Sequence, residues 1–110
     1  MMTIVRTTVI AVALTLLPGF ALGADSAAGQ AKAKEICQAC HGLDGNSPTP
    51  DYPKLAGQYP DYLAKALRDY KSGARKNPIM AGFAKSLTEK DIENVSAYFS
   101  TQPSVLATRY

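Results

Sequence analysis

Apolar side chains recur with a helical period between residues 59 and 70, at i, i+3, i+4, i+7, i+8 and i+11 from Tyr59. Pro60 lies at the start of this stretch and Gly73 just beyond its end, where helix termini favour these residues. The pattern predicts an amphipathic helix whose apolar face packs in the core, formed by Tyr59, Tyr62, Leu63, Ala66, Leu67 and Tyr70.

A second helical pattern follows Thr88, which is a good N-cap residue and stands three positions before Asp91. Leu87 and Ile92 flank this cap at the positions of a hydrophobic staple. Ile92, Val95 and Phe99 then form an apolar stripe, and Pro103 closes the segment. We expect a helix here that buries this stripe.

The rest of the chain adds helix and loop signals but no convincing strand. Residues 27–36 are rich in Ala, Lys, Glu and Gln, which are good helix formers. Residues 42–50 are mostly Gly, Asp, Asn, Ser and Pro, which is typical of a loop. The sequence therefore predicts an all-α fold of three to five helices.

The N-terminal 24 residues have the features of a cleaved signal peptide. Arg6 supplies a positive charge, residues 9–17 are apolar, and small residues follow Pro18. Cleavage is expected after Gly23 or after Ala24. The apolar run is shorter than the roughly 20 residues that span a bilayer, so retention as a membrane anchor is the less favoured alternative. The remaining residues 25–110 are expected to form one exported domain in the periplasm.

Composition limits what this domain can be. Removing 24 of the 110 residues leaves 86, too few for a large core. Only Arg6 is lost among the 12 basic residues, so 11 basic residues face 9 acidic ones. A net charge of +2 does not fit a nucleic-acid-binding domain.

The strongest chemical signal is Cys37-Gln38-Ala39-Cys40-His41. Two thiols three residues apart on a helical turn point the same way, and a histidine follows directly, which is the attachment signature of a c-type haem. Cys37 and Cys40 would form thioethers with the vinyl groups, and His41 would bind the iron. A zinc site would need a fourth ligand, which this chain does not offer. A thioredoxin-like pair and a small structural disulfide remain weaker alternatives.

Met80 is the candidate for the opposite axial position. After signal removal it is the only methionine, and His41 is the only histidine. The sixth ligand could also be a lysine or an exogenous molecule. Met80 lies in a Pro- and Gly-containing segment, residues 77–83, which we interpret as a loop between two helices. His/Met ligation would raise the reduction potential. The buried haem would also replace missing side-chain core, so the chain without haem should be largely unfolded.

These residues resemble a known family along essentially the whole mature chain. The haem motif, the stretches 52–58 and 72–75, the Met80 segment and Leu87-Thr88-x-x-Asp91-Ile92 with Tyr98 are similar to a class I cytochrome c of the small bacterial monohaem type. They are also similar to one half of the related dihaem proteins. The resemblance implies a small cytochrome c fold, with helices wrapped around one covalently bound haem c.

The resemblance also implies roles for single residues. Pro53 would offer its carbonyl to His41, and Arg75 would pair with a haem propionate. Gly29 and Tyr98 would mark the crossing of the first and last helices. Leu55, Ile79 and Phe83 would pack around the ring.

The function expected from these features is one-electron transfer between redox partner proteins, without catalysis. The chain would act as a monomer or within a redox complex, and Lys54, Lys76 and Lys85 could steer acidic partners. One alternative is the haem subunit of a larger oxidoreductase, such as a flavocytochrome c sulfide dehydrogenase. A haem sensor or peroxidase with an open sixth site, and a binding module without haem, are further alternatives.

Overall fold

The computed structural model describes residues 4, 8–13 and 23–106. Within them the chain forms four helical segments and no strand, which confirms the all-α prediction. The first segment is continuous and consists of α1, the π-helix η1 and α2. The elements are α1 (Ser26–Lys32), η1 (Ala33–Cys37), α2 (Gln38–His41), α3 (Pro60–Ser72), α4 (Pro78–Lys85) and α5 (Glu89–Ser100).

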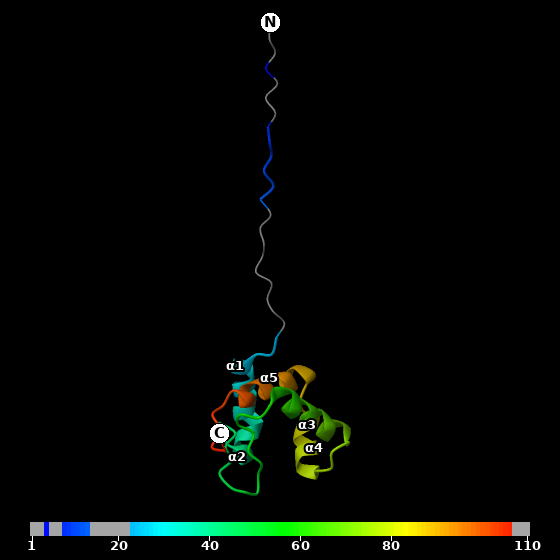
Figure 1. Ribbon diagram of the computed structural model, residues 1–110. Helices are drawn as coiled ribbons and strands as arrows, with labels where there is room; N and C mark the ends of the chain where they lie inside the picture. The colour runs from blue at the N-terminus through cyan, green and yellow to red at the C-terminus, as the bar shows by residue number, and fades with distance from the viewer. Residues whose placement is uncertain (1–3, 5–7, 14–22, 107–110) are drawn as a thin grey trace.

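The first and last helices cross in direct contact, as Figure 1 shows for α1 and α5. Gly29 is buried at this crossing, and a Cβ atom built on it would lie 2.0 Å from the Asn94 carbonyl oxygen and 3.0 Å from the Tyr98 Cβ. The sequence prediction for Gly29 and Tyr98 is confirmed. Next to the crossing, the main core cluster consists of Ala33, Leu63, Val95, Tyr98 and Phe99.

Helix α5 has the cap and the buried stripe that its sequence predicts. The Thr88 hydroxyl accepts from the Asp91 backbone N–H at 3.1 Å, and the Asp91 carboxylate accepts from the Thr88 backbone N–H at 2.9 Å. Ile92, Val95 and Phe99 are all buried. This reciprocal cap fixes where α5 begins and therefore which of its faces meets the other helices.

The apolar face predicted for α3 is only partly buried. Leu63 packs in the core, but Tyr59 is 79% exposed and Tyr62 is 53% exposed, so core packing is wrong for these two tyrosines. Tyr59 precedes the first turn of the helix, where few elements cover it. Tyr62 and the rest of the face line a cavity, which is described below.

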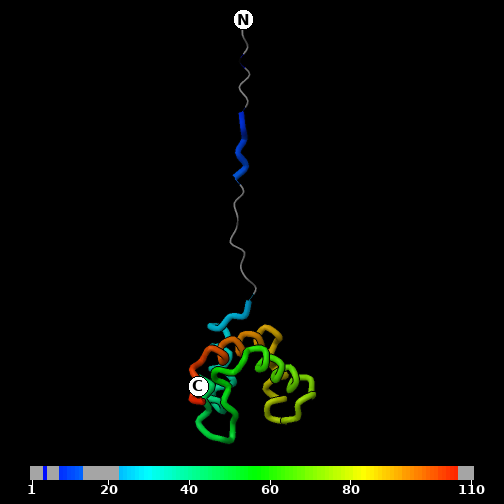
Figure 2. Tube along the Cα trace, in the orientation of Figure 1, coloured from blue at the N-terminus to red at the C-terminus, as the bar shows by residue number. Residues whose placement is uncertain are grey.

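The α2–α3 connection, residues 42–59, is irregular, as predicted for its first half. Figure 2 shows the C-terminal segment beside this loop, and the Asn46 side-chain amide donates to the Pro103 carbonyl at 2.9 Å. The Asn46 carboxamide oxygen also accepts from the Val105 backbone N–H at 2.9 Å. These contacts hold the loop against the end of the chain.

The predicted signal peptide falls largely outside the described residues, so its boundary and cleavage stay predictions. The described positions within it, such as Val9 and Ile10, are exposed. None of the helices in the described part of the chain has the length and apolar character needed to cross a membrane.

Candidate haem site

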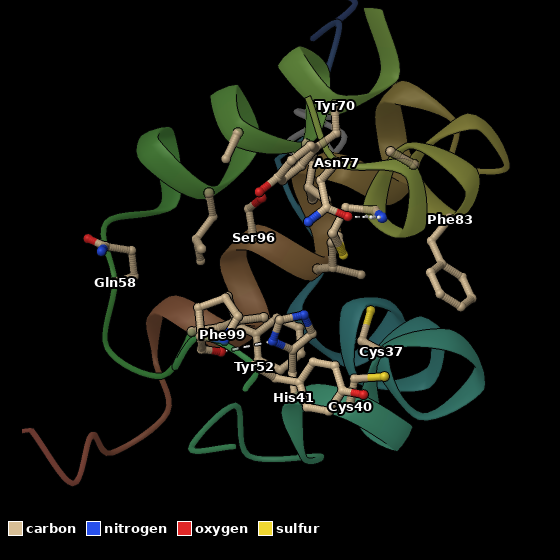
Figure 3. A pocket seen from close by; sticks show the side chains of 18 of the residues that line it. Cys37, Cys40, His41, Tyr52, Gln58, Tyr70, Asn77, Phe83, Ser96 and Phe99 are labelled. Carbon is tan, nitrogen blue, oxygen red and sulfur yellow. Dashed lines mark hydrogen bonds between the residues drawn. The ribbon is translucent and has the colours of Figure 1, made fainter. Parts of the chain in front are cut away.

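A cavity of about 360 Å³ lies between the helices. Its lining includes every residue that the sequence analysis singled out for cofactor binding: Cys37, Cys40, His41, Pro53, Leu55, Arg75, Ile79, Met80 and Phe83. These residues come from η1, α2, the α2–α3 loop, the α3–α4 connection and α4. In Figure 3, Cys37, Cys40 and His41 lie on one side, opposite Tyr70, Asn77 and Ser96.

The two cysteines lie at the end of η1 and within α2. The Gln38 backbone N–H donates to the Ala33 carbonyl, an i to i−5 bond that makes this turn π-helical. Such single π-turns are frequent at functional sites because they shift the register of the residues that follow. Here the turn comes directly before the motif.

The environment of Cys37 argues against its use as a redox nucleophile. Cys37 and Cys40 are not joined to each other. Burial raises the pKa of the Cys37 thiol to about 11, against an ordinary value of 9.0. A reactive redox thiol needs the opposite shift, because the thiolate is the nucleophile. The thioredoxin-like interpretation therefore loses support.

His41 is buried, and its Nδ1 lies 2.8 Å from the Pro53 carbonyl oxygen. A carbonyl oxygen only accepts, so Nδ1 carries the proton and donates it to this bond. In the neutral imidazole, Nε2 then carries the lone pair that binds a metal. This contact is the one that the resemblance assigned to Pro53, and the role of His41 as an iron ligand stays a prediction.

The loop after the motif is closed by Gly45, which brings Pro53 and Leu55 back to the cavity. The Gly45 carbonyl accepts from the Leu55 backbone N–H at 2.7 Å and from the Ala56 backbone N–H at 3.1 Å. Gly45 has a positive φ of 76°, and an added Cβ would lie 2.7 Å from Phe99 Cδ1. No larger residue fits this position without moving the loop.

Met80 lies in the first turn of α4, so the prediction that it belongs to a loop is wrong. The Asn77 side-chain oxygen accepts from the Ile79 backbone N–H at 3.1 Å and from the Met80 backbone N–H at 3.0 Å. Asn77 is therefore an N-cap and Pro78 occupies the first helical position, where its missing N–H costs nothing. Gly82 lies inside α4, so this glycine does not end the helix.

Other predicted residues line the cavity with varied exposure. Ile79 is 63% exposed and Phe83 is 42% exposed, while Leu55 is half-buried. The Arg75 guanidinium lies 4.8 Å from the centre of the Tyr70 ring. Its predicted pairing with a propionate is not tested by this contact.

Lys54 differs from the other two lysines proposed for steering. Its ammonium donates to the Asn46 carbonyl at 2.7 Å, and the residue is half-buried. Lys76 and Lys85 are exposed. Lys54 therefore fastens the loop and is poorly placed to meet a partner.

The polar lining residues that the sequence analysis did not name as site residues include Tyr52, Asn77 and Ser96. Tyr52 meets His41 edge to face, with ring centres 6.3 Å apart. The Asn-Pro pair was a usable helix-start signal for Asn77. Nothing in the sequence marks Ser96, because its inward position follows from the packing of α5.

The residues of this cavity fit a haem group. The walls carry mostly apolar side chains, as a flat apolar macrocycle requires. Two unpaired thiols lie three residues apart, and the imidazole beside them presents a free Nε2. Together with the all-α architecture, these features define a helical domain that attaches a porphyrin covalently.

Comparison with known proteins gives the family. The family model described as cytochrome c matches residues 26–103, and the chain belongs to the cytochrome c family. Its cofactor is therefore haem c, a covalently bound iron porphyrin. Electron transfer is the activity of this family.

Several relatives cover most of the domain. Cytochrome c4 of Pseudomonas aeruginosa is 52% identical over 91 residues, which are 81% of this chain and 45% of the relative. Cytochrome c-554(548) of Halomonas halodenitrificans is 41% identical over 81 residues, which are 71% of this chain and 96% of the relative. The chain thus spans about half the length of the cytochrome c4 relatives it matches.

Two further matches come from a redox complex and from a solved structure. The cytochrome subunit of sulfide dehydrogenase of Chlorobaculum tepidum is 40% identical over 63 residues, covering 57% of this chain and 56% of that subunit. The crystal structure of reduced recombinant cytochrome c4 from Pseudomonas stutzeri superposes with a TM-score of 0.69 at 45% identity. The match covers 74% of this chain and 47% of that one.

Proposed function

We propose that this protein is a one-electron carrier whose haem is held by Cys37 and Cys40 through thioethers and by His41 and Met80 as axial ligands. The observation that carries the proposal is the convergence of these four residues on one cavity, three from one helical segment and one from α4. Bound haem iron supplies one-electron chemistry by alternating between the ferric and ferrous states.

The surrounding residues hold this site in one geometry. Pro53 keeps the proton of His41 on Nδ1 and fixes the plane of the ring. Asn77 fixes the turn of α4 that carries Met80. Buried Val95 and Phe99 line the cavity and keep water from its inner wall. A rigid site favours electron transfer because little rearrangement accompanies the change of charge.

The site of action that we propose is the periplasm. Residues 1–24 are proposed to be a signal peptide removed after Gly23 or Ala24. Covalent haem attachment is expected in the exported space. Exposed Lys76 and Lys85 would attract acidic partner surfaces through contacts that weaken with added salt.

A second candidate function is that of the haem subunit of a larger oxidoreductase. The similarity to the cytochrome subunit of a sulfide dehydrogenase favours it. Purification of the untagged protein from its native cells separates the two functions. A flavoprotein that remains bound at high salt would indicate a subunit, and a haem protein purified alone would indicate a free carrier.

The first test is made on the purified exported protein. Its mass should exceed that of the mature chain by one haem, and the ferric spectrum should contain the weak red band of a thioether bound to iron. Met80→Ala should lose this band and lower the reduction potential, because the soft thioether favours ferrous iron. Ile79→Ala, in the same turn of α4, is the control and should keep the band. If Met80→Ala keeps both the band and the potential, Met80 is not the ligand.

A further inference from the structure

Ser96 carries a buried hydroxyl that the proposed function leaves unexplained. The residue is 2% exposed, and its Oγ has no hydrogen-bond partner among the described residues. Ser100, four residues later on α5, instead donates to the Ala97 carbonyl at 2.8 Å. An unsatisfied buried hydroxyl lowers the folding equilibrium constant roughly tenfold or more. Ser96 should therefore have a partner in the loaded protein.

The hydroxyl of Ser96 belongs to the wall of the haem cavity, and Tyr70 and Asn77 line the same cavity. In Figure 3 the Tyr70 side chain extends toward Ser96, on the side opposite His41. The Asn77 oxygen is already taken by two backbone N–H groups of α4. The Tyr70 hydroxyl, like the Asn77 side-chain NH2 group, makes no hydrogen bond within the described residues. We take the Tyr70 hydroxyl as the partner because its side chain extends toward Ser96.

We propose that the Tyr70 hydroxyl donates a hydrogen bond to Ser96 Oγ in the wall of the haem cavity, and that this polar pair helps set the reduction potential. The bond would join α3 to α5, which already pack against each other. The phenol is the more acidic hydroxyl and hence the better donor. The proposal rests on the proposed function, since it concerns the same cofactor.

The pair acts through the polarity of the wall. Ferric haem iron carries one more positive charge than ferrous iron, so polar groups nearby stabilise the ferric state more. Removal of either hydroxyl makes the wall less polar and should raise the potential. Both residues are positioning residues, because they are argued to act on the environment of the iron and not as its ligands.

The experiment is a double-mutant cycle in the haem-loaded protein with Ser96→Ala, Tyr70→Phe and the double variant. Tyr70→Phe keeps the ring that lies against Arg75. Each single variant should raise the unfolding equilibrium constant about fivefold, and the double variant should add little to either. Each should raise the potential by about 20 to 40 mV, a two- to fivefold change at about 59 mV per tenfold. Ser100→Ala is the control and should leave the potential unchanged.

Three results would overturn the proposal. Ser96→Ala could be as stable as the wild type or more stable, which would show that the hydroxyl has no partner. The two single effects could add, which would show that the residues do not share a bond. Both potentials could stay unchanged, which would remove the tuning role. Failure of the proposed function is separate, because the wild type itself would then lack haem or the iron–thioether band.

Discussion

The crossing of α1 and α5 at Gly29 gives the sharpest stability prediction. In Gly29→Ala the new Cβ would lie 2.0 Å from the Asn94 carbonyl oxygen and 2.5 Å from its carbonyl carbon. Both atoms are backbone within α5 and cannot rotate away. Ordinary van der Waals contact begins at 3.4 Å, so the helices must separate by roughly 1.4 Å. This would loosen the packing around Tyr98 and strain the bond from Asp25 N–H to the Asn94 side chain.

The magnitude follows from two opposed effects. Overpacking against a rigid backbone lies at the upper end of its usual range, about 3 kcal/mol. Alanine in a helix recovers about 1 kcal/mol relative to glycine. The net loss of unfolding free energy is then about 2 kcal/mol, which lowers Tm by roughly 8 to 16 °C in a domain of this size.

Thermal unfolding followed by circular dichroism measures this loss, with Gly82→Ala as a matched control. Gly82 lies inside α4, and a Cβ there meets nothing within 4 Å. The control should gain stability by about 0.5 to 1 kcal/mol, because only the glycine entropy changes. If Gly29→Ala melts at or above the wild-type temperature, the close helix contact does not exist in the folded protein.

Two further predictions concern helix caps. Hydrogen bonding from the Thr88 backbone N–H, with its hydroxyl and nearby lysines, holds the pKa of Asp91 below its ordinary 3.8. Its stabilisation is therefore present above that value and lost as pH falls through the folded pKa. Asp91→Asn keeps an acceptor for the Thr88 N–H but loses the negative charge near the helix N-terminus, so it should lower the free energy of unfolding by about 0.3 to 1 kcal/mol at pH 7. Urea titrations should show this difference closing below pH 3.8, and a difference that persists in acid contradicts the prediction. Asn77→Ala should weaken the iron–thioether band by fraying the first turn of α4, while Asn77→Asp, which can cap equally well, should restore it; an intact band in Asn77→Ala would show that the cap does not position Met80.

Sequence predicts the parts of this molecule that depend on neighbours in the chain. The Cys37–His41 motif, the Thr88 cap and the stripe of α5 are set by spacings of one to seven residues, and the structure has the last two as predicted. The exposure of Tyr59 and Tyr62 could not be predicted, because a helical period shows that a face is apolar but not what it faces. That face meets the cavity, so Leu63 and Ala64 supply most of the buried contact of α3.

The two sides of the cavity differ in how they are built. On the His41 side, the thiols, the imidazole and the Pro53 carbonyl lie within 17 consecutive residues, and a hydrogen bond joins His41 to Pro53. The rest of the lining takes Tyr70, Met80 and Ser96 from three separate helices. Of these helices, α4 buries only Ala84, so its first turn depends on the Asn77 cap more than on packing. Because a local motif can specify the first side alone, the proposed haem attachment would need only that segment. The proposed ligation by Met80 would instead require the tertiary fold. Met80 is therefore the residue whose local structure, a helix and not a loop, could not be predicted from its neighbours.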